Sequence, residues 1–285
     1  MLDANPFAGV VGPDKGQKTA KQYLYPEELL QLLSCEAVPL WRRRLYAFAV
    51  YSYMRAGEIA AIKWADVDTG PGFVTVHEAV DREGDRQAVS KLRKQKLSTT
   101  KPSGTKGTKT DAARTFRLEP NVLPMLQAMF VEAKDGRGLL FPVLPPPSGR
   151  GGMAAVFRDD LVTAGIDRQA LHNATATRKA MTFHDLRATA VTWAAIRGDS
   201  ELQIRARSGH ETLAVLSDYV REAAAIREGF GEVFPALPEC LLRIGSERPE
   251  SVPRVPRTPS FVEKFERDTG FEPATSSLGS WHSTN

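Results

Sequence analysis

The sequence predicts a mainly α-helical fold with a small antiparallel β-sheet, an α+β architecture. Apolar residues recur at helical spacing over most of residues 23–238. Residues 72–118 differ, because short β-rich segments there flank one long basic segment. The chain has 285 residues, of which 42% are apolar and 8% aromatic, so it is long enough to bury a sizeable core.

Three helices are expected at the start of this region. Pro26 suits the first turn of a helix, and an apolar stripe follows it at Leu29, Leu30, Leu32 and Leu33. A second helix begins at about Leu40 and has a common face formed by Leu45, Phe48, Ala49 and Ser52. A third, short helix over residues 55–64 is closed by the polar segment 65–70.

The expected sheet follows these helices. Residues 73–77 are β-branched and aromatic, which predicts a strand. Residues 109–110 and 114–118 predict a strand pair around the turn-prone Asp111. We therefore expect one small antiparallel sheet over residues 72–118, with a long basic loop.

Helices are expected again after the sheet. Residues 121–133 carry an apolar stripe formed by Val122, Leu126, Met129 and Phe130. A surface loop rich in Pro and Gly over residues 136–152 precedes an amphipathic helix over residues 153–164. Residues 1–22 have the composition of a linker or arm, and residues 239–285 that of a disordered tail, so the folded domain is predicted over residues 23–238.

Composition also limits where the protein acts. No apolar stretch approaches the ~20 residues that a membrane-spanning helix needs, and the longest, Leu45 to Met54, is interrupted by Ser52. The amino terminus lacks the basic and apolar regions of a signal peptide, and Cys35 and Cys240 alone form no disulfide framework. We therefore expect a cytoplasmic protein without a membrane partner.

The net charge of +4 conceals a strongly basic segment. Residues 82–117 hold eleven Lys and Arg residues against three acidic ones. Such a run is often a solvated loop, but it also marks a contact for a polyanion, because Lys and Arg supply most sequence-independent affinity for DNA. The candidate DNA-binding residues are Arg93, Lys94, Lys96, Lys101 and Lys106.

A possible phosphate site begins at Thr182. A Thr N-cap with Asp185 three positions later predicts a helix start, with His184 in the first turn and Arg187 on the same face. A helix amino terminus carries unpaired N–H groups and a partial positive charge, so an added imidazole and guanidinium favour an anion there. The alternative for this motif alone is an exposed helix start with ordinary polar residues.

Three further residues have special positions. His210 follows Gly209, and Tyr219 lies nine residues later, with a short helix expected between them. Arg55 opens a helix directly after an apolar segment, which requires exposure in a cleft or a partner such as Glu58. Each residue by itself has an ordinary explanation, such as a satisfied histidine or a core tyrosine.

Taken together, these motifs resemble those of the tyrosine recombinases, also called the phage integrase family. The resemblance covers about residues 5–235 and rests on Arg55-Ala56-Gly57-Glu58, Lys109 before Arg114, His184-Asp185-Leu186-Arg187, Gly209-His210 and Tyr219, in order and spacing. It implies the catalytic-domain fold of that family over residues 23–238. It also implies a site-specific DNA recombinase or integrase from a bacterium, a phage or another mobile genetic element.

The resemblance further implies a set of catalytic roles. Arg55 and Arg187 clamp the scissile phosphate, with Glu58 in support, and Tyr219 attacks it to form a 3′-phosphotyrosyl link. Lys109 protonates the leaving 5′ oxygen, while His184 and His210 assist by hydrogen bonding and proton transfer. Two guanidiniums can offset the transition-state charge, so no metal, ATP or other cofactor is required. The implied partners are double-stranded DNA and a homotetramer on synapsed DNA sites.

The chain departs from the family pattern at several positions. Tyr53-Met54 stands where Gly-Leu is often found, and Ala188 stands where a second histidine is common. Lys109 is assigned by its five-residue spacing to Arg114, but Lys101 and Lys106 lie on the same segment. Family members usually carry a separate DNA-binding domain before the catalytic one, and here a linker-like arm precedes Tyr23, so we expect a start upstream or a truncated gene.

Two other functions fit parts of the sequence. A truncated, non-catalytic DNA-binding remnant of an integrase would keep the basic segment and lose strand cleavage. A metal-dependent phosphohydrolase of the His-Asp type would use the adjacent pair His184-Asp185 with His172 or His210 and Asp218, although these show no recognisable ligand spacing. Activity in the presence of a chelator separates this second alternative from a recombinase.

Overall fold

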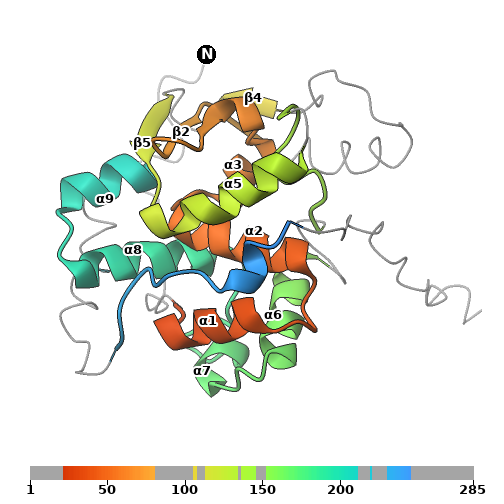
Figure 1. Cartoon of the computed structure of the whole chain (residues 1–285). Helices are drawn as coiled ribbons and strands as arrows, with labels where there is room; N and C mark the ends of the chain where they lie inside the picture. The colour runs from red at the N-terminus through yellow and green to blue at the C-terminus, as the bar shows by residue number, and fades with distance from the viewer. Residues whose placement is uncertain are drawn as a thin grey trace, which may run out of the picture. The chain divides into compact units, whose positions relative to one another are not determined.

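A computed structural model of the chain describes residues 22–80, 105–107, 113–133, 136–145, 152–210, 219 and 230–244. These residues form a mainly helical domain with short strands at one end (Figure 1). The α-helices described are α1 (Pro26–Ser34), α2 (Leu40–Tyr51), α3 (Ala56–Ala61), α5 (Leu123–Glu132), α6 (Met153–Thr163), α7 (Gln169–His172), α8 (Asp185–Arg197) and α9 (Glu201–Ser208). The short 3-10 helices are η1 (Trp64–Asp66), η2 (Pro120–Val122) and η3 (Glu239–Leu241).

The strands form two small antiparallel sheets. They are β1 (Val67–Asp68), β2 (Phe73–Val76), β3 (Glu78–Val80), β4 (Thr105–Gly107) and β5 (Arg114–Arg117). Strand β2 lies between β1 and β5, with Val74 opposite Phe116 and Val76 opposite Arg114, and β3 pairs with β4. The predicted strand at 73–77 and antiparallel pairing within 72–118 are thus confirmed, but the strands form two sheets instead of one, and β1 lies before residue 72. The described partner of β5 is β2, whereas the expected pairing of residues 109–110 lies outside the described residues.

Helix α2 runs through the core, and every residue from Arg43 to Tyr51 is buried. The single apolar face predicted for this helix is therefore too narrow. Its two buried arginines obscure the apolar pattern, and both donate to specific partners in the core. Arg44, for example, donates to both carboxylate oxygens of Glu132 at 2.7 and 3.0 Å and to the carbonyl of Leu241 at 3.0 Å.

The packed domain extends past residue 238, where the tail was expected to begin. Leu241 in η3 is fully buried, and Arg44 also donates to the carbonyl of Arg243 at 2.8 Å. The sparse apolar residues of this stretch are buried individually against α2, so no periodic pattern marks them in the sequence. Residues 245–285 lie outside the described residues.

Two expectations about the burial of apolar residues between 130 and 152 are corrected. Residues 136–152 were expected to form a surface loop, yet Leu140 and Phe141 are buried, and the Phe141 ring lies 5.4 Å from that of Phe48. Phe130 was expected on the buried face of its helix, but it is 45% exposed and its ring meets that of Trp64 edge to face. The predicted helices at 26, 40, 55, 121 and 153 are otherwise confirmed within a few residues.

Helices α8 and α9 pack against each other beside the sheet end of the domain (Figure 1). Helix α8 begins at Asp185, two residues later than predicted, with His184 instead of Thr182 as its N-cap. The reason is local, because the Asp185 carboxylate accepts from the Thr182 N–H and hydroxyl, both at 2.8 Å, and so closes a separate turn before the helix. Helix α9 was not predicted, although Ser200 and Gln203 form a capping box at its start.

In the described parts of the chain, none of the helices is both long and apolar enough to cross a membrane.

Candidate active site

Four of the six predicted catalytic residues gather at the carboxyl end of α9. Arg55 is the N-cap of α3, and Arg187 lies in the first turn of α8. His210 directly follows Gly209, the left-handed C-cap of α9. The ring of Tyr219 lies 6.2 Å from the ring of His210, at an interplanar angle of 44°. Residues that are far apart in the sequence therefore face one small region of the fold.

The other predicted site residues are either exposed at the edge of this region or lie outside the described side chains. His184 is exposed at the start of α8. Lys109 lies outside the described residues, and so do Arg93, Lys94, Lys96 and Lys101. Lys106 belongs to β4, where the backbone alone is described.

Glu58 is the carboxylate on which the arginines converge. Its side chain is 2% exposed and accepts from Arg55 Nη1 at 2.9 Å and from the Arg55 N–H at 2.8 Å. Arg114 donates to both oxygens, at 3.0 and 2.7 Å. Burial disfavours the ionised form, but the hydrogen bonds and charge of Arg114 and the Arg55 N–H outweigh it and hold the pKa of Glu58 below its usual value. Glu58 thus holds Arg55 and Arg114 together through one buried carboxylate.

The two arginines bound to Glu58 also hold the end of α9. Arg55 Nη2 donates to the carbonyl of Gly209 at 2.8 Å, and Arg114 Nε donates to the carbonyl of Arg207 at 3.2 Å. Gly209 has φ +64°, and a Cβ atom there would lie 3.0 Å from the Arg114 guanidinium. A side chain at this position would therefore be strained, and glycine suits both the close approach and the turn that presents His210.

Arg187 is a buried cation with unusual neighbours. It is 4% exposed, donates from Nη1 to the carbonyl of Tyr53 at 2.9 Å, and places Nη2 3.4 Å from His210 Nε2. Burial lowers the pKa of its guanidinium, and the positive charge of Arg55 adds to this effect while Glu58 opposes it. The folded protein thus holds this cation at an electrostatic cost that a bound anion would relieve.

The hydrogen bonds of His210 define its tautomer. Ser208 Oγ donates to the carbonyl of Ile204 at 2.6 Å, so its oxygen is left to accept from His210 Nδ1 at 2.8 Å. A proton on Nδ1 leaves Nε2 as an acceptor, and Nε2 is the atom that faces Arg187. In this tautomer the ring nitrogen that faces the buried guanidinium is the acceptor, and the ring of Tyr219, which is 6% exposed, lies beside the same imidazole.

Sequence reasoning missed two contributors to this site. In the sequence, Arg114 was used only as the reference position from which Lys109 was assigned. In the structure it is a main partner of Glu58. Tyr53 stood out as a departure from the family pattern, but nothing in the sequence indicates that its carbonyl binds Arg187. Both contacts join residues more than fifty positions apart, and opposite charge is a signal in the sequence for the Arg114 pair alone.

The alternative of a metal-dependent site gains no support from the described residues. Across that part of the chain, no group of three His, Cys, Asp or Glu side chains could hold a metal ion. The carboxylate of Asp185 is used by the turn at Thr182.

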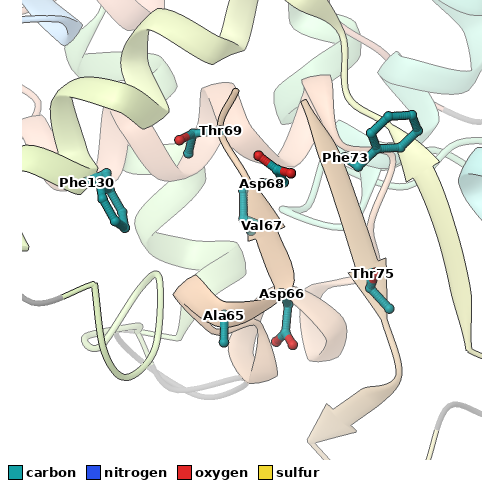
Figure 2. Close-up of a pocket in the computed structure, with 8 residues that line it drawn as sticks. All are labelled: Ala65, Asp66, Val67, Asp68, Thr69, Phe73, Thr75 and Phe130. Atoms are coloured by element: carbon teal, nitrogen blue, oxygen red, sulfur yellow. The ribbon is translucent and has the colours of Figure 1, made fainter. Parts of the chain in front are cut away.

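A separate hollow of about 500 Å³ lies beside β1 and β2 (Figure 2). Figure 2 shows Asp66 and Asp68 among its lining residues, with Phe73 and Phe130 at its sides. It contains none of the predicted site residues, and its two carboxylates would repel a phosphate. This hollow is therefore distinct from the arginine cluster.

The fold is that of the catalytic domains of tyrosine recombinases. The integrase of transposon Tn1549, in complex with transposon right end DNA, is similar with a TM-score of 0.52 and 17% identity, over 76% of this chain and 67% of that chain. A lambda integrase dimer bound to a COC′ core site is similar with a TM-score of 0.50 and 16% identity, over 79% of this chain and 68% of that chain.

The sequence assigns the chain to a family. The sequence model of the phage integrase family matches residues 22–225, so the chain belongs to that family. The XerA recombinase has a TM-score of 0.47 and 17% identity over 73% of this chain, and the chain spans less than two thirds (62%) of the length of XerA. A search of curated protein sequences found no match.

Proposed function

We propose that this protein is a site-specific DNA recombinase that cleaves and rejoins DNA through a 3′-phosphotyrosyl intermediate on Tyr219. One observation carries the proposal above all. The buried cation Arg187 lies 3.4 Å from His210 Nε2, and the ring of His210 lies 6.2 Å from that of Tyr219. A phosphate ligand, a proton acceptor and a nucleophile are thus adjacent.

The arginines supply the electrostatic part of the mechanism. Attack on a phosphodiester adds negative charge to the nonbridging oxygens, and donors already fixed in place stabilise that charge best. Arg55 is fixed by Glu58 and by the Gly209 carbonyl, and Arg187 is fixed by the Tyr53 carbonyl. A guanidinium has five N–H groups, so each arginine retains donors for the phosphate after these contacts.

The proton transfers follow from the tautomer of His210. A phenol with a pKa near ~10 is a weak nucleophile until its proton is removed. As the bond from Tyr219 Oη to phosphorus forms, His210 Nε2 accepts the phenol proton. The bond from phosphorus to the 5′ oxygen breaks, and that oxygen takes a proton from Lys109. Rejoining is the reverse reaction with a DNA 5′-hydroxyl, and it consumes no ATP because the phosphotyrosine conserves the phosphodiester bond. His184, exposed at the start of α8, donates to the phosphate.

The partner of this site is double-stranded DNA. The basic segment 82–117 carries the proposed contacts Arg93, Lys94, Lys96, Lys101 and Lys106. The Tn1549 and lambda integrases were solved as complexes with DNA, and the same class of ligand suits the arginine cluster here. We propose further that the active unit is a homotetramer on two synapsed sites, with residues 1–22 as an arm before the catalytic domain.

The decisive experiment is a test for the covalent intermediate. The full chain is incubated in EDTA with DNA fragments from both flanks of its gene, and an SDS-stable protein–DNA adduct is measured. Wild type should form the adduct and Tyr219→Phe should not, while both bind the DNA equally. DNA binding by wild type without any adduct would instead identify a non-catalytic remnant. An adduct that persists in Tyr219→Phe would contradict the assigned nucleophile.

A further inference from the structure

Tyr53 has a backbone conformation that its residue type avoids. It lies two residues before Arg55, is fully buried, and has φ +58°. In this left-handed region Cβ crowds the carbonyl oxygen, so residues other than Gly and Asn seldom adopt it. Among the described residues one other non-glycine, Phe234, has a positive φ, and its ring lies 5.7 Å from that of Tyr53. Such strain persists only where the surrounding structure enforces it.

The conformation has a direct consequence for the candidate active site. It turns the carbonyl of Tyr53 toward Arg187, whose Nη1 donates to it at 2.9 Å. A helical continuation of α2 would direct this carbonyl along the helix axis instead. The left-handed residue therefore provides the acceptor that holds one side of the buried guanidinium.

A buried network holds Tyr53 in place through its hydroxyl. The hydroxyl donates to Glu119 Oε1 at 2.6 Å, and Glu119 is 3% exposed. Arg197 donates to both oxygens of Glu119 at 2.7 and 2.8 Å, and Arg207 donates to Oε1 at 2.8 Å. Burial and the charge of Glu119 raise the pKa of Tyr53 well above its ordinary value, so the hydroxyl remains a donor.

We propose that Tyr53 is a positioning residue for Arg187, with its hydroxyl anchored on Glu119 to maintain the left-handed backbone that aims its carbonyl at the guanidinium. The inference rests on the proposed role of Arg187 in the reaction. The same anchor fixes α9, because Arg207 lies on that helix two residues before Gly209. One network thus sets both Arg187 and the turn that carries His210.

The first comparison is between Tyr53→Gly and Tyr53→Ala, which both remove the ring. Glycine adopts the left-handed conformation without strain, whereas alanine does not. Single-turnover adduct formation at saturating DNA should fall at most about threefold in Tyr53→Gly and roughly a hundredfold in Tyr53→Ala, since small displacements of catalytic groups have effects of that order. A pure packing role for the ring predicts the opposite order, because glycine leaves the larger cavity.

The second comparison isolates the hydroxyl. Tyr53→Phe removes the bond to Glu119, and Tyr51→Phe is its matched control, because Tyr51 is also buried, also packs on Phe234 and also donates from its hydroxyl, to the carbonyl of Pro235. We expect Tyr53→Phe to slow adduct formation about tenfold with unchanged DNA affinity. Tyr51→Phe should leave the rate within about twofold, since its loss is one ordinary hydrogen bond.

A third measurement does not depend on activity. The ¹⁵N signals of the Arg187 guanidinium report whether its rotation is restricted by the Tyr53 carbonyl. The signals should remain restricted in Tyr53→Gly and in Tyr51→Phe, and they should be averaged in Tyr53→Ala. Glu119→Gln keeps the ring of Tyr53 but weakens its anchor, so it should reduce the restriction. This variant replaces the comparison at residue 53 if those variants fold poorly. Equal behaviour of Gly and Ala, or of the two Phe variants, would overturn the inference. If wild type forms no adduct, the proposed function fails while these signals still decide the positioning role.

Discussion

Arg114 and Glu58 form a two-point ion pair, at 3.0 and 2.7 Å, that joins the first residue of β5 to the middle of α3. The same carboxylate holds the side chain and the N–H of Arg55. Arg114 therefore acts on a proposed phosphate ligand through a shared buried acid. Since Glu58 is 2% exposed, loss of either arginine would leave part of its charge uncompensated.

Arg114→Ala should lower the free energy of unfolding by about 3–5 kcal/mol, the usual effect of breaking one side of a buried pair. Arg117→Ala is the matched control, because Arg117 lies on the same strand and is exposed, and it should change stability by about 0.5 kcal/mol or less. Urea unfolding measures both. Equal losses in the two variants would show that the pair with Glu58 contributes nothing specific.

The lowered pKa of Glu58 predicts a pH dependence. A carboxyl group whose pKa is lower in the folded state stabilises the fold above its unfolded value, near 4.5, and this contribution is lost as the pH falls through the folded value. Glu58→Gln should therefore be clearly less stable than wild type at pH 7, with a difference that shrinks below pH 4.5. Glu36→Gln, at an exposed position, should show neither effect. A constant difference at both pH values would contradict the assignment.

Much of this site follows from local sequence patterns. Arg55, His184, Arg187, His210 and Tyr219 are found because together they match short family motifs in order and spacing, and Arg55, His184, Arg187 and His210 lie at or near helix ends. The strands β2 and β5 can also be predicted, because each contains β-branched and aromatic residues within four positions. Periodicity and motif spacing are properties of neighbouring residues, so a single sequence contains them.

What the sequence does not contain are the distant contacts that orient those motifs. The Arg114 to Glu58 pair and the bond from Tyr53 to Glu119 join different elements, and any of the many charged residues is an equally good partner by composition. The left-handed φ of Tyr53 is contrary to its residue type. Leu241 is likewise buried by tertiary packing within a stretch that has no apolar period. These features depend on the folded surroundings rather than on local propensity.

Arg187→Lys tests whether the buried cation acts by geometry or by charge alone. A lysine keeps the charge but has one donor group, so it cannot bind the Tyr53 carbonyl and a phosphate with the planar geometry of a guanidinium. We expect the single-turnover rate to fall by roughly a hundredfold or more, with DNA affinity within about threefold, because the lost interaction is strongest in the transition state. Arg178→Lys, at a partly exposed position directly after a turn, serves as the control. Parallel loss of affinity and rate would make Arg187 a binding residue.

Ser208→Ala tests the tautomer of His210. The hydroxyl oxygen of Ser208 accepts from Nδ1, and without it the proton is free to move to Nε2. The ¹⁵N shifts of His210 should show Nδ1–H in wild type and a mixture of tautomers in the variant, with slower adduct formation. Ser52→Ala removes another fully buried serine hydroxyl far from His210 in sequence and should change neither signal. Wild-type His210 protonated on Nε2 would contradict its proposed role as proton acceptor.

Lys109 is assigned as general acid because a cationic donor is needed at the departing 5′ oxygen. A DNA substrate with a bridging sulfur at that position has a leaving group that needs no proton. Lys109→Ala should therefore be strongly impaired on ordinary DNA and restored on the sulfur substrate. Lys106→Ala is the matched control on the same basic segment, and it should lose affinity rather than show selective restoration. Restoration of Lys106→Ala instead of Lys109→Ala would transfer the role of general acid to Lys106.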